Sequence, residues 1–306
     1  MTELGRTLAA ADVAITALLV NWHSASDLHR AAASLRARAF RPARVRFLIV
    51  DNTGGRDRGL SELAAPDVDL LAVDPGERRG SWGHAFGLAC GFERITTPYA
   101  LVSDPDVHVF LRGWDERLIG AMKGSGAITA GAPYPWWKLG KYHDFPSPVF
   151  ALLDVPAIRR IGVDWTPFAT KPLRRGYDLV ARQVVRLGGM ATRRRLLAMP
   201  RLATWARRLE KVLGVCGPDT GYRIAAAARR AGAGSLLLDV AGPADVSPVG
   251  SAANALALEF ELFYHQGLPA VAHRYSSRSR LWRTERGHDD QYFRECIARL
   301  EQRDAP

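Results

Sequence analysis

The first hundred residues alternate between short apolar runs and amphipathic stretches, and this alternation constrains the fold more than any other feature of the sequence. The apolar runs are long enough for buried strands but too short for typical helices, and they occupy 13–20, 45–50, 68–73 and 99–103. Helical patterns lie between them, from about Ser26 to Arg38 and from Gly80 to about Arg94. Such alternation is typical of a parallel sheet with crossover helices, so we expect an α/β fold.

Polar residues follow the carboxyl ends of all four predicted strands. The loops that leave the strands begin at Asn21, Asp51, Asp74 and Asp104. In open α/β sheets, ligands bind outside the carboxyl ends of the strands. We therefore expect these four loops to converge on one binding site.

The loop with the most specific motif is Ser103-Asp104-Pro105-Asp106, directly after an apolar strand. Residues i and i+2 of an extended segment point to one side, so both carboxylates can face one cation, and Pro105 restricts the backbone between them. Mg²⁺ and Mn²⁺ prefer oxygen ligands and share them with substrate phosphates. An ordinary strand-ending turn would show the same pattern. The chain contains a second such pair, Asp67-Val68-Asp69, but it precedes a strand, so we expect no function there.

The order and spacing of these motifs, from residue 13 to about 130, resemble the nucleotide-binding half of the family-two GT-A glycosyltransferases. The motifs that carry the resemblance are Asn21-Trp22-His23, Asp51-Asn52-Thr53-Gly54-Gly55, Gly80-Ser81-Trp82-Gly83-His84 and Asp104-Pro105-Asp106. The resemblance implies a GT-A fold, in which a Rossmann-like, mostly parallel sheet is flanked by helices. It also implies inverting transfer of a sugar from a UDP-, dTDP- or GDP-linked donor, with Mn²⁺ or Mg²⁺ as the cofactor.

The resemblance assigns the nucleotide sugar to the loops at the strand ends. In that family, the aspartate that matches Asp51 contacts the base or the ribose, and the segment from Gly80 lines the nucleotide. The residues predicted to bind the nucleotide sugar are Asn21, Asp51, Asn52, Gly80, Trp82, His84, Asp104 and Arg278. The alternatives are structural, because Asp51 and Asn52 before two glycines form a good loop on any fold.

The metal ligands implied by the resemblance are Asp104, Asp106 and a histidine near the C-terminal end of the core. His273, at the end of a short apolar strand, matches that histidine, and His265 competes with it. A lone histidine in such a place is more often structural than a ligand. Arg278 lies in a basic stretch that could clamp a diphosphate or lie at the surface.

The catalytic base implied by the resemblance is Asp219, in Cys216-Gly217-Pro218-Asp219-Thr220-Gly221. The sequence departs from the family here, because Pro218 stands where the family has a first acidic residue. Asp219 would take the proton from the acceptor hydroxyl. An aspartate before a helix that starts near Pro218 and runs to Arg230 would also be a good N-cap. Asp144 and Asp164 are reserve candidates for the base.

The second half of the chain, 131–306, is predicted to bind the acceptor, as the continuation of one GT-A domain whose nucleotide-binding half is 1–130. The stretch from Gly131 to Pro148 is too aromatic for a passive linker and too rich in proline for a helix. Its aromatic rings could stack on a sugar, a nucleobase or another ring. The residues that we expect to contact the acceptor are Trp136, Trp137, Tyr142 and His143. Later elements are predicted at Gly234–Val240, a strand, and Asp289–Gln302, a helix.

The net charge of +11 is concentrated in one segment, a predicted helical, basic acceptor-side insertion at 171–215. Twelve Lys or Arg residues lie between Lys171 and Lys211, against two acidic residues. Within it, Leu202, Trp205, Leu209 and Val212 recur at helical spacing, which predicts an amphipathic helix with these residues buried. Such local charge suits an anionic partner, either a phosphorylated acceptor or a membrane surface contacted peripherally through 171–211.

Two other classes of protein share some of these features. A sugar nucleotidyltransferase would need a glycine-rich basic loop after the first strand, and this chain has Asn21 to Ser26 there. In a nucleic-acid-binding protein we would expect a recognition motif and aromatic residues among the arginines, so no specific nucleic-acid partner is predicted. No apolar run approaches a membrane span, no signal peptide is evident, and the three cysteines are far apart, so we expect a cytoplasmic protein with reduced thiols.

Overall fold

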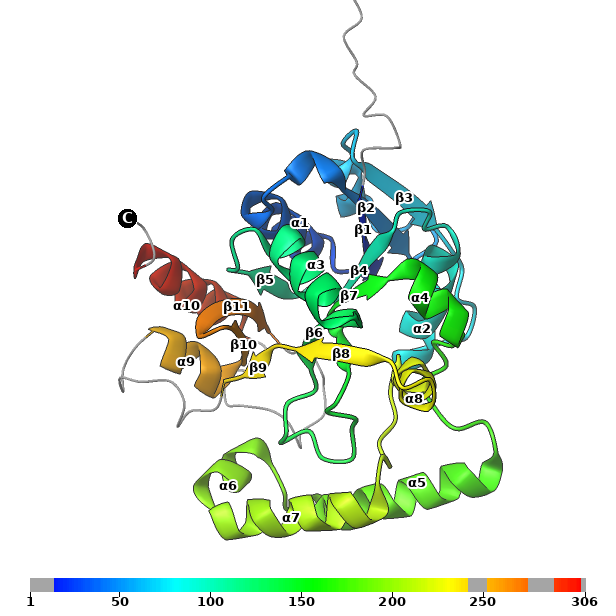
Figure 1. The fold of residues 1–306 in the computed structure, drawn as a ribbon, viewed down its shortest axis with the longest axis vertical. Coiled ribbons are helices and arrows are strands. Elements are labelled where there is room, and N and C mark those ends of the chain that lie inside the picture. Colours follow the sequence, from blue (N-terminus) through cyan, green and yellow to red (C-terminus); the bar gives the residue numbers. More distant parts are fainter. Residues whose placement is uncertain (1–13, 242–251, 275–288, 304–306) are drawn as a thin grey trace, which may run out of the picture.

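The computed structural model describes residues 14–241, 252–274 and 289–303, which form a mixed α/β structure around a seven-stranded sheet (Figure 1). The strands lie in the order β3-β2-β1-β4-β7-β6-β8. Their bounds in chain order are β1 Ile15–Asn21, β2 Val45–Asp51, β3 Val68–Ala72, β4 Tyr99–Ser103, β6 Ala127–Pro133, β7 Pro146–Asp154 and β8 Gly234–Leu237. All neighbours pair in parallel except β7, which is antiparallel to both β4 and β6. The predicted mostly parallel sheet with flanking helices is confirmed.

Helices cover both faces of this sheet. One face packs on α1 (Ala25–Arg38) and α3 (Trp114–Ser125), and the other on α2 (Ser81–Glu93), α4 (Val155–Ile161) and α8 (Tyr222–Arg230). The central strand β1 is buried along its length because its side chains alternate between the two layers: Leu19 faces the first and Leu18 the second. Short 3₁₀ turns, η1 (Pro42–Arg44) and η2 (Arg58–Leu63), flank β2.

A second sheet of four strands lies beside the first and builds the C-terminal part of the fold. Its order is β5 (Val107–Val109), β11 (Leu268–His273), β10 (Glu261–His265) and β9 (Asp239–Val240). It packs against α9 (Ala252–Glu259) and α10 (Asp290–Arg303). The prediction of one strand at Gly234–Val240 is therefore wrong: the chain changes sheets at the buried Leu238, whose amide donates to the carbonyl of Gly131.

The basic segment forms a separate helical layer below the main sheet (Figure 1). It contains α5 (Pro172–Val185), the 3₁₀ turn η3 (Leu187–Gly189), α6 (Arg193–Ala198) and α7 (Pro200–Leu213). Trp137 and Leu139, from the loop after β6, fill the core between this layer and the rest of the molecule. The predicted helical character of the insertion is confirmed.

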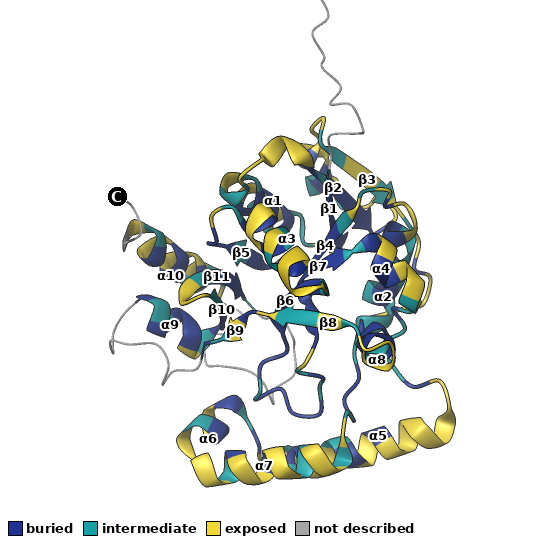
Figure 2. Ribbon diagram, in the orientation of Figure 1, coloured by how far each residue is buried: buried dark blue, intermediate teal, exposed yellow. Residues whose placement is uncertain are grey.

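The predicted buried stripe of α7 is wrong at two of its four positions. Trp205 is 54% exposed and Val212 is 83% exposed, whereas the buried residues of this helix are Ala203 and Ala206. Small residues let α7 approach α5 closely, so the larger apolar side chains lie outside the contact. Figure 2 shows that most of the surface of α5 and α7 is exposed.

The remaining predicted elements lie close to the observed ones. The predicted helices near 26–38, 80–94 and 289–302 correspond to α1, α2 and α10. The helix predicted from Pro218 begins only at Tyr222. The boundary placed at residue 130 falls inside β6, since the large sheet takes strands from both halves of the chain. No helix among the described residues is both long and apolar enough to cross a membrane.

Replacement of Gly131 by alanine tests the pairing between β6 and β7. An added Cβ would lie 2.0 Å from the carbonyl oxygen of Phe150 in the paired strand, and backbone atoms cannot move aside without disturbing the ladder. We expect Gly131→Ala to lower the free energy of unfolding by about 3 kcal/mol, measured by urea denaturation. Gly120→Ala in α3 is the matched control, with no atom within 4 Å of its added Cβ, and should stabilise by about 0.5–1 kcal/mol. Equal midpoints for both variants would contradict the prediction.

Candidate functional site

Strand pairing brings the two ends of the candidate site together. The turn Asp104-Pro105-Asp106 leaves β4 in the large sheet and enters β5 in the small one. β5 pairs antiparallel with β11, and its register places Val107 opposite His273. The amide of Arg274 donates to the carbonyl of Asp106, which extends this ladder by one bond. The turn is thus fixed by both sheets.

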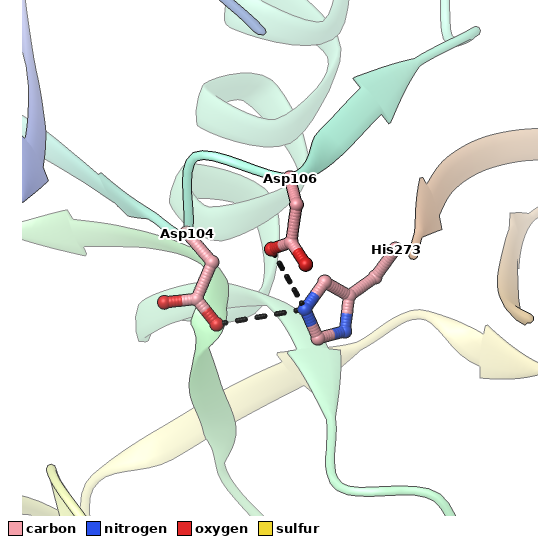
Figure 3. A group of neighbouring side chains, drawn as sticks. All are labelled: Asp104, Asp106 and His273. Atoms are coloured by element: carbon pink, nitrogen blue, oxygen red, sulfur yellow. Dashed lines mark ion pairs between the residues drawn. The ribbon is translucent and has the colours of Figure 1, made fainter. Parts of the chain in front are cut away.

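The side chains of Asp104, Asp106 and His273 converge on one point (Figure 3). The Nε2 atom of His273 lies 3.1 Å from Oδ1 of Asp106 and 3.7 Å from Oδ2 of Asp104. Each of the three residues offers one ligand atom, and these atoms all lie within 4.8 Å of one another. The structure therefore selects His273 over His265, which lies at the other end of the β10–β11 hairpin, opposite Leu268.

A second layer of buried charges orients His273. Oε2 of Glu261 lies 2.9 Å from its Nδ1 atom, and Oε1 of the same carboxylate lies 2.5 Å from Nζ of Lys138. Burial works against a charged imidazole, but Asp106 and Glu261 raise the pKa of His273 to about 10. Burial likewise opposes ionisation of Asp106, and the cation of His273 nevertheless lowers the pKa of Asp106 to about 2. Burial raises the pKa of Asp104.

The chemistry of this cluster fits a divalent cation. Oδ2 of Asp106 is buried and has no hydrogen-bond partner among the described residues, so it is available as a ligand. A carboxylate that accepts from Nδ1 leaves Nε2 of His273 directed at the site, an arrangement common around metal-bound histidines, and a bound cation would replace the proton on Nε2. Two carboxylates and one imidazole suit Mn²⁺ and related ions, and two carboxylates alone suit Mg²⁺.

Two cavities meet at this cluster. The Trp22 cavity, of about 390 Å³, is lined on one side by Trp22, Asn52, Arg78 and Arg79. The Asp219 cavity, of about 460 Å³, is lined by Tyr134, Lys138, Lys141, Arg182 and Asp219. Both are lined by Gly80, His84 and Asp104. A ligand that fills both cavities would therefore pass directly over Asp104.

A larger cavity, of about 780 Å³, lies away from the cluster between α1 and α10. Most of its charged side chains have partners: Arg38 and His108 both pair with Glu301 at 2.6 and 3.0 Å, and Arg30 and Arg294 pair with Asp290 at 2.8 and 3.2 Å. Because these charges already have partners, we assign the chemistry to the two smaller cavities.

The predicted nucleotide residues divide into those that line these cavities and those that hold the loops behind them. Asn52, Gly80, His84 and Asp104 line the Trp22 cavity. Asn21 is fully buried, and its amide nitrogen donates to Oδ1 of Asp51 at 2.9 Å. Neither Asn21 nor Asp51 is among the residues that line it.

The carboxylate of Asp51 is occupied by its own loop. Oδ1 accepts from the amide and the hydroxyl of Thr53, and Oδ2 accepts from the amide of Gly55. Burial works against ionisation, yet the hydrogen bonds from Thr53 and Asn21 lower the pKa of Asp51. In this structure Asp51 therefore shapes the loop, and its predicted contact with the base or ribose stays a prediction.

The other nucleotide predictions lie around α2 and the C-terminal segment. His84 lies 3.6 Å from Asp104, measured from Nε2 to Oδ1. Trp82 packs edge-on against Phe168, with ring centroids 6.0 Å apart, and lines neither cavity. Arg278 lies outside the described residues.

Asp219, the predicted base, lines the cavity that bears its name. Its Oδ2 accepts from Nζ of Lys141 at 2.5 Å. Burial opposes ionisation, but the Lys141 ammonium lowers the pKa of Asp219 to about 2. The alternative role as a helix N-cap is wrong, because α8 begins later and has Gly221 at its N-cap position, with a left-handed φ of 86°. The carboxylate is thus free of the helix and directed into an ion pair.

The reserve candidates for the base are engaged elsewhere. Asp144 pairs with Arg229 and Asp164 with Arg223 at 2.7 Å. Neither aspartate lines either of the two cavities that meet at Asp104. Asp219 is therefore the only one of the three predicted bases that lines the Asp219 cavity.

The aromatic loop lines the Asp219 cavity with residues other than the predicted ones. Trp137 and Tyr142 are 1% and 2% exposed and belong to the core. The Trp136 ring lies 4.8 Å from the guanidinium carbon of Arg207, and His143 pairs with Glu210 of α7 at 3.2 Å. Trp136, Trp137 and His143 attach the helical layer to the rest of the molecule. Tyr142 instead packs in the core beside Tyr134, and its hydroxyl donates to the carbonyl of Thr220. The cavity is instead lined from this loop by Tyr134, Lys138 and Lys141.

The charged residues of the site that were missed from the sequence include Arg78 and Arg79 of the Trp22 cavity, and also Glu261, Lys138 and Lys141. The Gln266-Gly267 turn, where both residues have positive φ, 50° and 78°, pairs His265 with Leu268. A bulge between Phe263 and Tyr264 then shifts the register, and only this shift pairs Glu261 with His273, so the turn alone does not predict the contact. No comparable local signal marks the two lysines, which are placed by an irregular loop.

Comparison with known proteins gives distant structural likeness only. No family model and no curated protein matches this sequence. Similar solved structures include glycosyltransferases, which are matched at low TM-score. They include S. aureus TarS 1–349, with TM-score 0.38 and 11% identity over 50% of each chain. The alignment thus spans about half of that TarS chain.

Two further structures align over more of this chain. The mannosyltransferase PcManGT from Pyrobaculum calidifontis, in complex with GDP-Man and Mn²⁺, has TM-score 0.41 and 14% identity over 72% of this chain and 76% of that chain. Mouse xyloside xylosyltransferase 1 has TM-score 0.39 and 12% identity over 74% and 85% of the two chains. Likeness at this distance leaves the function to be inferred from the site.

Replacement of one carboxylate tests the metal site. We expect Asp106→Asn to weaken Mn²⁺ binding by more than about tenfold, since changes even to residues behind metal ligands often cost that much. Isothermal titration with Mn²⁺ measures the effect. Asp67→Asn is the matched control in the other Asp-x-Asp pair, where Asp67 binds Arg36 at 2.8 Å. Equal Mn²⁺ affinities for the two variants would place the metal elsewhere.

Proposed function

We propose that this chain is a metal-dependent glycosyltransferase that moves a sugar from a nucleotide-diphosphate sugar to an acceptor hydroxyl in one inverting displacement. The observation that carries the proposal is the position of Asp104, Asp106 and His273 where two cavities meet. A donor must bind its diphosphate next to the sugar that reacts, and a cation site at this junction supports a nucleotide in one cavity and an acceptor in the other. The sequence motifs around it support the same assignment.

The Trp22 cavity is assigned to the nucleotide and its diphosphate. Arg78 and Arg79 line it and supply positive charge, and α2 begins at Ser81 beside it, with Gly80, Gly83 and His84 in the cavity lining. Guanidinium groups and helix N-termini both favour phosphate oxygens. Trp22 is 47% exposed at its edge and offers a flat ring to a base.

Asp104, Asp106 and His273 would hold Mn²⁺ or Mg²⁺ at the diphosphate. When bound, such a cation would offset the negative charge that develops on the leaving group. Glu261 keeps the imidazole oriented toward that point.

Asp219 is assigned the removal of the proton from the acceptor hydroxyl. It lines the Asp219 cavity together with Asp104, so an acceptor bound there would lie beside both carboxylates. Its low pKa makes it ionised at neutral pH but a weak base while Lys141 is paired with it. We infer that acceptor binding loosens the contact with Lys141 and thereby strengthens the base.

The acceptor is assigned by class only, as a small molecule or a glycan, with room for an anionic group. Lys141 and Arg182 line the cavity, and Tyr134 and Phe168 supply aromatic surface to stack on a ring. Arg182 belongs to α5, so the helical layer contributes directly to this cavity.

A nucleotide panel tests the donor site. We expect one of UDP, dTDP, GDP, CDP and ADP to raise the unfolding temperature of the wild type when Mn²⁺ is present, and not with EDTA. A ligand at 100 times its dissociation constant contributes about 2.7 kcal/mol. Asp104→Asn should lose the shift, whereas Asp69→Asn, at the other Asp-x-Asp pair, should keep it. A shift that is independent of metal and of Asp104 would overturn the donor assignment.

Replacement of Lys141 tests the base through the pH profile of transfer. The Lys141 ammonium holds the pKa of Asp219 low, so Lys141→Met should raise that pKa and move the acid limb of kcat/KM to higher pH. Below the raised pKa the base is protonated and activity falls. The control is Lys123→Met, on α3 away from the cavity, which should leave the profile unchanged. An unshifted acid limb in Lys141→Met would remove Asp219 from the role.

A further inference from the structure

Exposed apolar side chains are concentrated on the helical layer. Nine of the fifteen large apolar residues that are exposed in the described part of the chain lie between residues 171 and 213. Leu173 is 91% exposed and Val212 is 83% exposed. Scattered exposed apolar residues are ordinary, but a concentration in one layer marks an interaction surface.

These residues follow the helical repeat. Leu173, Tyr177, Val180 and Val184 of α5 are spaced by four, three and four residues, so they form one stripe, and all four are exposed. On α7, Trp205 and Val212 are two turns apart on the side away from the buried Ala203 and Ala206. The two helices contact each other, since the Tyr177 hydroxyl donates to the carbonyl of Leu213.

The charge around the stripes has one sign. Nine Lys or Arg residues of this layer are exposed, among them Lys171, Arg175, Arg201, Arg208 and Lys211. The two acidic residues of the segment are withdrawn from the surface: Asp178 is 8% exposed and pairs with Arg174 at 2.9 Å, and Glu210 accepts from the amide of Gly140. The exposed face of the layer thus carries positive charge and apolar groups without exposed carboxylates.

We propose that the helical layer, residues 171–213, docks on an anionic lipid bilayer. Positive charge beside exposed apolar stripes is the pattern of helices that lie in a membrane interface, where cations meet lipid headgroups and apolar groups enter the acyl boundary. Nucleic acid fits less well. Its phosphates would pair with the positive charges but would leave the aliphatic residues Leu173, Val180 and Val212 in water. The proposal does not depend on the glycosyltransferase assignment, since it rests on the outer surface of these helices.

Docking would also place the Asp219 cavity beside the bilayer. α5 carries Arg182 into that cavity and the stripe from Leu173 to Val184 on its exposed side. One short helix therefore connects the lipid-facing surface with the space assigned to the acceptor. An acceptor held at the membrane surface would reach the cavity from this side.

Vesicle sedimentation of the full chain tests the proposal. We expect binding to phosphatidylcholine vesicles that contain phosphatidylglycerol and none to phosphatidylcholine alone. Arg201→Ser with Arg208→Ser should weaken binding by roughly thirtyfold, since each cation near the surface is worth about a sixfold change. Leu173→Ser with Val212→Ser should weaken it by about tenfold, also at high salt. Quenching of Trp205 by brominated lipid, lost in Trp205→Phe, should report insertion.

Matched changes elsewhere on the surface provide the control. Leu268, in the β10–β11 hairpin, is 55% exposed, and Arg112 is exposed beside α3, so Leu268→Ser with Arg112→Ser should leave vesicle binding unchanged. No sedimentation with anionic vesicles at low salt would overturn the proposal. So would binding that the Leu173 and Val212 changes leave intact, or a preference for duplex DNA over vesicles. A dimer in solution that these same changes dissociate would assign the surface to a second copy instead.

Discussion

The antiparallel pairing of β5 with β11 is the interaction on which the candidate site depends. It brings His273, far along the chain, opposite Val107 and next to the carboxylate of Asp106. The two sheets meet at this point, because β5 directly follows the turn that leaves β4. A one-residue slip in this register would turn His273 to the other face of the small sheet, so the ladder fixes the position and the direction of the side chain together.

The buried charges around His273 hold one another in place. Asp106 and Glu261 contact its two ring nitrogens, and Lys138 offsets the second carboxylate. Buried ions are costly unless they are paired, and removal of one partner leaves the other uncompensated. The network therefore contributes little to folding on balance. The network orients the side chains of His273 and Asp106. Asp104, which is only partly buried, then lines both cavities.

The sequence predicts the parts of this structure that depend on neighbouring residues. Strand periodicity locates β1, β2 and β4, and the position of Asp104 directly after a strand identifies the turn. Prediction from the sequence fails where tertiary contacts determine whether a side chain is buried. Trp137 belongs to an aromatic stretch expected to bind a ring, but its side chain is buried in the core. Trp205 has the spacing of a buried stripe but is exposed, because α7 packs through alanines. Hydrophobic spacing fixes a face of a helix, and only the packing partner determines whether that face is covered.

The helical layer carries a cavity residue and an exposed apolar stripe on one helix. α5 contributes Arg182 to the Asp219 cavity, and its exposed stripe lies on the other side of the same helix. A helix moves as a rigid unit, so a ligand that immobilises one side also fixes the other. If lipid and acceptor both bind here, each must change the affinity for the other by the same factor, because the free energies around the binding cycle sum to zero. The Lys141–Asp219 pair, which lines the same cavity as Arg182, is the group through which such a coupling would reach the base.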